Sequence, residues 1–215
     1  HGLMTSSYSF RYVMAPLARD YRVIAPDLVG AGRSAHPDAP SYSAAALAAF
    51  LGELVDELGV DGCFAVGNSL GGYLCLRLVL ERPTVFGRLV NIHSPARPEL
   101  RLHALRAALS VPFVRPALAW AVRSSPQRWA HRNVHYFDET LKSREEAAEY
   151  GAPLASSEGS RSFVRYLHET VSPSGFAELD RTLRERLAND EPFPIPLLLL
   201  YARRDPMVSP DNGPH

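Results

Sequence analysis

Apolar residues along the first hundred positions follow two spacings, one typical of strands and one typical of helices. Short runs rich in apolar residues predict strands at residues 21–26, 63–66 and 88–92. Apolar residues recurring every three or four positions predict helices at residues 43–58 and 70–81. Ser43 is a candidate N-cap for the first helix, and Gly59 is a candidate C-terminal stop. Strands that are apolar throughout predict an α/β fold class, with a mostly parallel sheet covered by helices on both faces.

The pattern becomes purely helical over the middle of the chain. Candidate helices lie at residues 100–109, 114–122, 140–150, 161–170 and 176–187. Strand character returns at residues 195–202. A helical insertion between two strands of one sheet predicts a lid over the carboxyl edge of the sheet. We therefore expect a first core part at residues 1–97, a helical lid (cap) insertion at 98–190 and a second core part at 191–215.

Charge and cysteine content narrow the classes of partner. Lys plus Arg and Asp plus Glu both number 23, so the chain has a formal net charge of zero and no general attraction to nucleic acid or anionic membranes. No apolar run reaches the roughly 18 residues that a membrane span needs. Cys63 and Cys75 lie in apolar runs, which predicts buried free thiols and is compatible with a cytoplasmic location. A small-molecule substrate is therefore the expected partner, and composition leaves the oligomeric state open.

The run Gly67-Asn68-Ser69-Leu70-Gly71 lies between a predicted strand and a predicted helix. A Gly-x-Ser-x-Gly pattern alone is weak evidence, but a serine with a strand before it and a helix after it indicates a nucleophile on a sharp turn. Such a turn needs small neighbours, which Gly67, Gly71 and Gly72 supply. A serine hydroxyl also needs a histidine base and an acid that orients the base. The alternative is a tight turn whose serine only caps the helix.

Three further stretches extend this pattern. Residues 1–11 begin with His-Gly-Leu, residues 27–34 read Asp-Leu-Val-Gly-Ala-Gly-Arg-Ser, and residues 201–208 read Tyr-Ala-Arg-Arg-Asp-Pro-Met-Val. Together with the run around Ser69, and in this order, the chain resembles the α/β-hydrolase fold superfamily. Within it, the resemblance is to the lidded branch that includes haloalkane dehalogenases, epoxide hydrolases and small esterases. It covers nearly the whole chain and is weakest in the predicted lid.

The resemblance implies a role for each matching residue. Ser69 would attack the substrate carbonyl, and Asp205 would orient the base. The backbone N–H groups of Leu3 and Leu70 would form the oxyanion hole. Asp27 would brace the glycine loop that follows it. No cofactor is implied, and no pair of histidines has convincing metal-ligand spacing.

The catalytic histidine is the missing member of this set. In the family the base follows the acid after one more strand, whereas His215 comes only ten residues after Asp205 and a strand alone takes about five or six residues. His93, at the end of a predicted strand, is expected to line the pocket or the core, with the role of the base as the alternative. His1 is expected to shape the oxyanion turn. The chain also begins on a segment that the family places after its first strands. We therefore expect a fragment of a longer protein, with the base beyond residue 215.

The serine nucleophile separates the activities of this branch. Haloalkane dehalogenases and epoxide hydrolases of this fold use an aspartate at the position of Ser69, which disfavours both activities. The leading hypothesis is a carboxylesterase-like serine hydrolase that cleaves an ester-type bond of a small apolar substrate through an acyl-enzyme. Asn68 resembles the residue beside the serine in carbon–carbon bond hydrolases of aromatic degradation, so a diketone-like substrate is an alternative. A non-catalytic binding protein with an α/β-hydrolase fold is the third hypothesis.

Overall fold

The computed structural model describes residues 1–38, 41–97, 100–170, 172–205 and 208–209. Contacts divide the chain into two compact units. The first unit comprises His1–Pro40 and Val111–Arg165, and the second comprises Ser41–Ser110 and Tyr166–His215. The residues of each unit contact one another, so the two units are described separately. The division into core and lid expected from the sequence stays a prediction.

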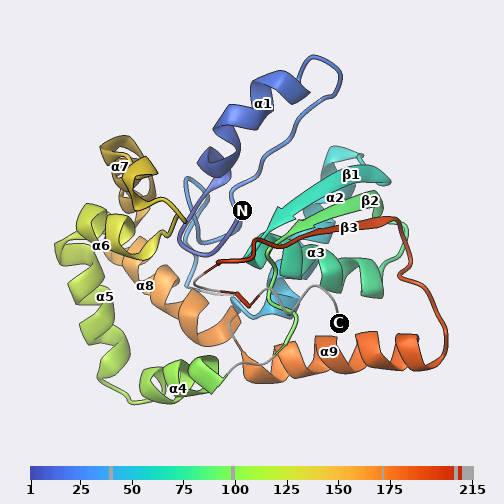
Figure 1. The fold of residues 1–215 in the computed structure, drawn as a ribbon. Helices are drawn as coiled ribbons and strands as arrows, with labels where there is room; N and C mark the ends of the chain where they lie inside the picture. The colour runs from blue at the N-terminus through green and yellow to red at the C-terminus, as the bar shows by residue number, and fades with distance from the viewer. Residues whose placement is uncertain (39–40, 98–99, 171, 206–207, 210–215) are drawn as a thin grey trace. The chain divides into compact units, whose positions relative to one another are not determined.

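The second unit contains a parallel three-stranded sheet in the order β1-β2-β3 (Figure 1). The strands are β1 (Cys63–Asn68), β2 (Phe86–Ile92) and β3 (Leu197–Leu200). All three lie where the sequence predicts strands, and β1 and β2 are each two residues longer than predicted. Val66 pairs with Val90, and Val90 pairs with Leu198, so the three strands end at a common carboxyl edge. The α/β fold class, with helices flanking a parallel sheet, is confirmed.

Helices complete the second unit. They are α2 (Ala44–Leu58), α3 (Leu70–Glu81), α4 (Leu100–Leu109), a π-helix (Tyr166–Thr170) and α9 (Pro173–Ala188). The hydroxyl of Ser43 accepts a hydrogen bond from the Ala46 N–H, and Gly59 has a φ of +61°, so both predicted helix ends of α2 are confirmed. Helix α3 packs against α2, β1 and β2 and is buried along most of its length. It therefore forms the centre of this unit.

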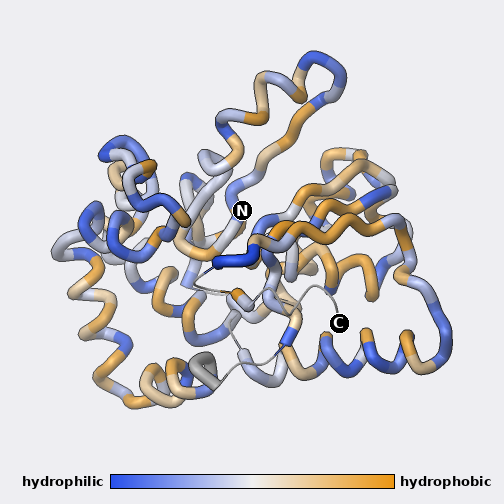
Figure 2. The backbone as a smooth tube through the Cα atoms, viewed as in Figure 1, coloured by the Kyte–Doolittle hydropathy of each residue, from blue (hydrophilic) through white to orange (hydrophobic). Residues whose placement is uncertain are grey.

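The face of β1 that points away from α3 carries exposed apolar side chains. Gly67 lies on the α3 side, whereas Phe64 and Val66, at odd spacing from it, are 60% and 48% exposed. Figure 2 shows the apolar character of the strands. The predicted cover on both faces is therefore not seen for β1 in the described part of the chain, because α3 reaches only one face of this strand.

The first unit is helical. Its elements are the 3-10 helix η1 (Ser7–Phe10), α1 (Arg11–Leu17), α5 (Val114–Ser124), α6 (Pro126–Asn133), the 3-10 helix η2 (Glu139–Leu141), α7 (Arg144–Gly151), the 3-10 helix η3 (Pro153–Ala155) and α8 (Ser157–Arg165). Helices η1, α1, α6 and η3 were not predicted. The predicted strand at residues 21–26 is wrong, because residues 22–26 form no β-bridge and a strand exists only through pairing with a neighbour. Apolar composition alone does not supply that neighbour.

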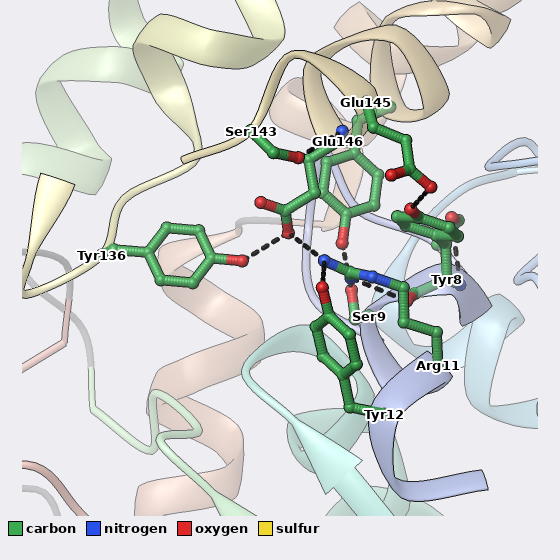
Figure 3. A network of polar contacts seen from close by, with 10 residues as sticks. Tyr8, Ser9, Arg11, Tyr12, Tyr136, Ser143, Glu145 and Glu146 are labelled. Atoms are coloured by element: carbon green, nitrogen blue, oxygen red, sulfur yellow. Dashed lines mark hydrogen bonds and ion pairs between the residues drawn. The ribbon is translucent and has the colours of Figure 1, made fainter. Parts of the chain in front are cut away.

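A network of polar side chains joins the N-terminal segment of the first unit to α7 (Figure 3). The carboxylate of Glu146, only 5% exposed, accepts a hydrogen bond from the Tyr136 hydroxyl and lies 3.2 Å from Nη2 of Arg11. The Arg11 guanidinium donates to the Tyr8 carbonyl at 3.1 Å and to the Tyr12 hydroxyl at 3.3 Å. It also stacks 4.2 Å from the centroids of both tyrosine rings. Burial, followed by the bond to Glu146, raises the pKa of Tyr136 and keeps its hydroxyl a donor.

Glu146→Ala is expected to destabilise the protein by about 2 kcal/mol in urea unfolding. The substitution leaves Arg11 without its carboxylate and the Tyr136 hydroxyl without its acceptor. The loss is smaller than for a fully enclosed pair, since the Arg11 side chain is 21% exposed. Glu149→Ala, on the same helix, removes a 2.7 Å bridge to an Arg33 side chain that is 83% exposed, and its effect should stay under about 1 kcal/mol. Equal destabilisation by Glu146→Ala and Glu149→Ala would contradict the expectation that the buried ion pair contributes more stability than the exposed one.

Two expectations from composition concern thiols and membranes. Cys63 and Cys75 are both free; Cys75 is buried, which raises its pKa to about 12, and Cys63 is only half-buried. Within the described ranges, no single helix is both long and apolar enough to cross a membrane. The helical segments His103–Leu109 and Val114–Ser124 meet that length and composition only as a bent pair.

Candidate active site

Ser69 sits at the turn between β1 and α3 in a backbone conformation that non-glycine residues rarely adopt. Its φ is +51° and its ψ is −114°, which places the residue outside the helix that it precedes. Ser69 occupies the N-cap position of α3, but its side chain makes no capping hydrogen bond. The hydroxyl of Ser69 is thus not used for helix capping. This geometry argues against a serine that serves only as a cap, and positive φ at a non-glycine residue marks a functional turn.

Close backbone approach explains the glycines of this turn. A Cβ atom on Gly67 would lie 2.5 Å from Cα and 2.6 Å from N of Gly72, both main-chain atoms. A Cβ atom on Gly72 would lie 2.0 Å from Oγ of Ser94 and 2.3 Å from Oδ1 of Asn91. Gly67 is therefore required for the close approach of β1 to α3, and Gly72 is required for the close approach of α3 to the side chains of Asn91 and Ser94. The steric requirement predicted from the sequence is confirmed at Gly67 and Gly72.

Polar residues after all three strands meet at the carboxyl edge of the sheet. The Ser69 N–H donates to the Ile92 carbonyl at 2.8 Å, and the Ser94 hydroxyl lies 2.9 Å from the Ser69 carbonyl oxygen. The Tyr201 hydroxyl donates to the Ser94 carbonyl at 2.7 Å, and burial raises the pKa of Tyr201, which keeps that proton in place. The turn after β2 thus ties the Ser69 turn to the segment after β3. Parallel strands bring such residues together because their carboxyl ends share one edge.

Asp205 follows β3 in the same unit and contacts His93, which follows β2. Oδ1 of Asp205 accepts a hydrogen bond from the Val208 N–H at 2.8 Å, and Oδ2 lies 3.7 Å from Nδ1 of His93. Nε2 of His93 accepts a hydrogen bond from the Ala202 N–H. Both ring nitrogens of His93 are therefore directed at the segment after β3. This contact between two chemically active side chains was not predicted, although the sequence places both after strands of one sheet.

The proposed oxyanion donors come from different units. Leu70 is the first residue of α3, so its N–H has no acceptor in a preceding helical turn. Leu3 belongs to the first unit, where it precedes Met4, a residue with a φ of +65°. The roles of both N–H groups stay predictions.

The segment around Leu3 is held by two residues whose supporting roles were expected. Nε2 of His1 accepts a hydrogen bond from the Leu28 N–H at 3.0 Å. The Asp27 carboxylate accepts from the N–H groups of Ser7 at 2.6 Å and Arg33 at 2.8 Å. A Cβ atom on Gly32 would lie 2.3 Å from this carboxylate. Asp27 therefore braces the glycine loop, as predicted. The bond to Leu28 ties His1 to the start of that loop, and its role in the oxyanion turn stays a prediction.

No histidine ring among the described residues is hydrogen-bonded to the Ser69 hydroxyl. His93 follows β2, the strand that pairs with β1, but its ring faces Ala202 and Asp205. His215 lies outside the described residues. The part of the chain that the structure describes also contains no group of three His, Cys, Asp or Glu side chains arranged to hold a metal ion.

A separate cavity of about 620 Å³ lies in the second unit. Its charged or titratable lining residues are Arg77, Arg106, His168, Glu169, Glu178 and Arg181. Arg77 is paired with Glu178 at 3.0 Å. Neither Ser69 nor Asp205 lines this cavity, so we do not assign it to their chemistry.

Comparison with known proteins agrees with this architecture. A model of the family described as alpha/beta hydrolase fold matches residues 1–215, the whole chain. The chain belongs to the α/β hydrolase fold family.

The similar proteins include enzymes of several activities. An uncharacterised protein from Mycobacterium tuberculosis is 34% identical over 134 residues, which cover 57% of this chain and 39% of that protein. A 2-hydroxy-6-oxo-2,4-heptadienoate hydrolase from Pseudomonas putida is 39% identical over 87 residues, covering 40% of this chain and 32% of that enzyme. The crystal structure of haloalkane dehalogenase DbeA from Bradyrhizobium elkani superposes with a TM-score of 0.72 at 27% identity, covering 94% of this chain and 70% of that one. The matches to the Mycobacterium tuberculosis and Pseudomonas putida proteins thus span well under half of the lengths of those two proteins.

Proposed function

We propose that the protein is a serine hydrolase that cleaves an ester-type bond of a small apolar substrate through an acyl-enzyme on Ser69. The observation that carries the proposal is the backbone of Ser69, which has a φ of +51° between β1 and α3 and a side chain that does not cap the helix. That turn presents the hydroxyl at the carboxyl edge of the sheet, where ligands bind in open α/β sheets.

Three groups would act on the substrate carbonyl in this mechanism. The Ser69 hydroxyl adds to the carbonyl carbon and gives up its proton to a histidine base. The N–H of Leu70, at the positive end of the α3 dipole, and the N–H of Leu3 hold the oxyanion. Collapse of the adduct expels the alcohol, which takes the proton back from the base. Water, activated by the same base, then releases the acid from Ser69.

Asp205 is the acid that orients the base in this proposal. It follows β3 at the carboxyl edge that also carries Ser69, and one of its oxygens is already fixed by the Val208 N–H. The base in this proposal is a histidine, and no histidine ring among the described residues is hydrogen-bonded to the Ser69 hydroxyl. The small apolar substrate is proposed from the aliphatic residues of the predicted lid alone.

The serine also argues against two activities found in the family. Attack by Ser69 on an alkyl halide or an epoxide would form an ether, which has no carbonyl for water to add to, so the enzyme would not turn over. An aspartate nucleophile forms an ester instead, and water cleaves it. Hydrolysis of a carbon–carbon bond in a diketone remains the second candidate, because it too begins at a carbonyl. It is supported by the similarity to the Pseudomonas putida hydrolase.

A fluorophosphonate probe on the full-length protein tests the nucleophile. Covalent labelling, mapped by peptide mass spectrometry to the peptide that contains Ser69, is the expected result. Nitrophenyl esters of short and medium acids should be turned over faster than a vinylogous diketone, a bromoalkane or a styrene-type epoxide. Faster diketone cleavage would replace the ester assignment by the second candidate. The absence of labelling together with no turnover of any substrate would instead indicate a binding protein.

A further inference from the structure

His93 occupies a strained position directly after β2. Its φ is +53°, a value that costs energy for any residue with a Cβ atom. Its main-chain N–H donates to the Leu200 carbonyl at 2.9 Å, which extends the pairing of β2 with β3 by one step. The fold thus holds His93 against the segment that leads to Asp205.

The hydrogen bond at one ring nitrogen of His93 defines its tautomer. Nε2 accepts from the Ala202 N–H, so Nε2 carries no proton. In the neutral ring the proton must then reside on Nδ1. Nδ1 is buried, has no hydrogen-bond partner among the described residues, and lies 3.7 Å from Oδ2 of Asp205. The only ring donor of neutral His93 therefore faces the carboxylate of the proposed acid.

We propose that His93 is a positioning residue for Asp205, an inference that rests on the proposed function of Asp205. The Val208 N–H fixes Oδ1, and the Nδ1–H of His93 fixes Oδ2 when the separation of 3.7 Å closes on substrate binding. The Ala202 N–H, bound to Nε2, holds the start of the same loop. His93 thus sets the direction in which the carboxylate meets the base, and it takes no proton from Ser69.

Two conservative variants separate the two ring contacts. In His93→Gln the amide oxygen can replace the acceptor at Nε2, but the donor toward Asp205 is lost. In His93→Asn the amide nitrogen can replace the donor at Nδ1, but the acceptor for Ala202 is lost. For the best ester substrate, His93→Gln should lower kcat by about 10- to 100-fold with KM within about twofold. His93→Asn should restore kcat toward the wild-type value, and His103→Gln, at an exposed position on α4, should change neither constant.

Asp205→Asn distinguishes failure of this inference from failure of the proposed function. If Asp205→Asn leaves kcat unchanged, Asp205 is not the acid, and the role of His93 is overturned with it. If Asp205→Asn lowers kcat while His93→Gln equals the wild type, the role of His93 alone is overturned. In the double variant, His93→Gln should add nothing to the effect of Asp205→Asn. If the double variant lowers kcat by the product of the two separate effects, His93 acts independently of Asp205, which also overturns the inference.

Nitrogen-15 NMR of the wild-type protein tests the tautomer without any substitution. The expected signature is a His93 ring protonated at Nδ1 and unprotonated at Nε2. A neutral ring protonated at Nε2 would lack the donor toward Asp205 and would overturn the inference even if no His93 variant folds. Far-UV circular dichroism and melting curves of the variants identify any that lose the fold.

Discussion

Ser69→Ala is expected to lower turnover of the best ester substrate by about 10⁴-fold or more and to abolish fluorophosphonate labelling. The variant keeps the main chain that donates to Ile92, so the loss would come from the hydroxyl alone. The Ser69 side chain caps nothing in α3, and its removal therefore costs little stability. The melting temperature should stay within a few degrees of the wild type. The variant would thus lose activity and keep its stability, as expected for a residue whose strained backbone serves the reaction.

Ser94→Ala is the matched control for this experiment. Ser94 is a fully buried serine whose hydroxyl lies 2.9 Å from the Ser69 carbonyl oxygen, so it touches the same turn without facing the substrate. The Ser94 variant should lose stability and keep probe labelling at Ser69. Persistent labelling and turnover in Ser69→Ala would rule out the acyl-enzyme on Ser69. Loss of labelling in Ser94→Ala, with the fold intact, would move the nucleophile to the neighbouring turn.

Local signals in the sequence are sufficient to place the elements around the nucleophile. The helix predicted at residues 70–81 is α3, and the one predicted at residues 100–109 is α4, with identical bounds. Ser43 and Gly59 mark the ends of α2 because a capping hydroxyl and a residue with positive φ act within a single turn. The motif at Ser69 is equally local, since the strained turn and its glycines lie within six residues. The residues that signal these features lie close together in the sequence.

Features that depend on distant partners were not predicted. Residues 21–26 have the composition of a strand, but pairing requires a neighbour that composition does not specify. Helix α6 was also not predicted, because its sequence is polar. Pro126 is its first residue, a position where the missing N–H costs nothing. The approach of His93 to Asp205 joins residues more than a hundred positions apart through the parallel order of β2 and β3. Sequence reasoning found each residue separately, and only the sheet order shows that they meet.

Gly67→Ala is expected to destabilise the protein by about 3 kcal/mol or more, because the new methyl group would overlap main-chain atoms of α3. The added Cβ atom would lie 2.5 Å from Cα of Gly72, 2.6 Å from its N and 2.8 Å from C of Gly71. No rotamer change relieves a contact with backbone, so β1 and α3 must move apart. The same movement displaces Ser69, which lies between them, so probe labelling should slow even in the folded fraction. Urea unfolding and labelling rates measure the two effects.

Gly52→Ala is the control that separates steric overlap from the general cost of replacing a glycine. Gly52 lies inside α2, and a Cβ atom there would meet Cδ1 of Leu78 at 3.3 Å, the end of a flexible side chain that can shift. Alanine favours a helix interior over glycine by about 1 kcal/mol, which offsets that shift, so the variant should be neutral or slightly more stable. Equal destabilisation at both positions would mean that the packing of β1 on α3 is looser than the contacts at Gly67 imply. A stable Gly67→Ala protein with normal labelling would contradict the steric account of the nucleophile turn, because that account requires the backbone of β1 to touch the backbone of α3.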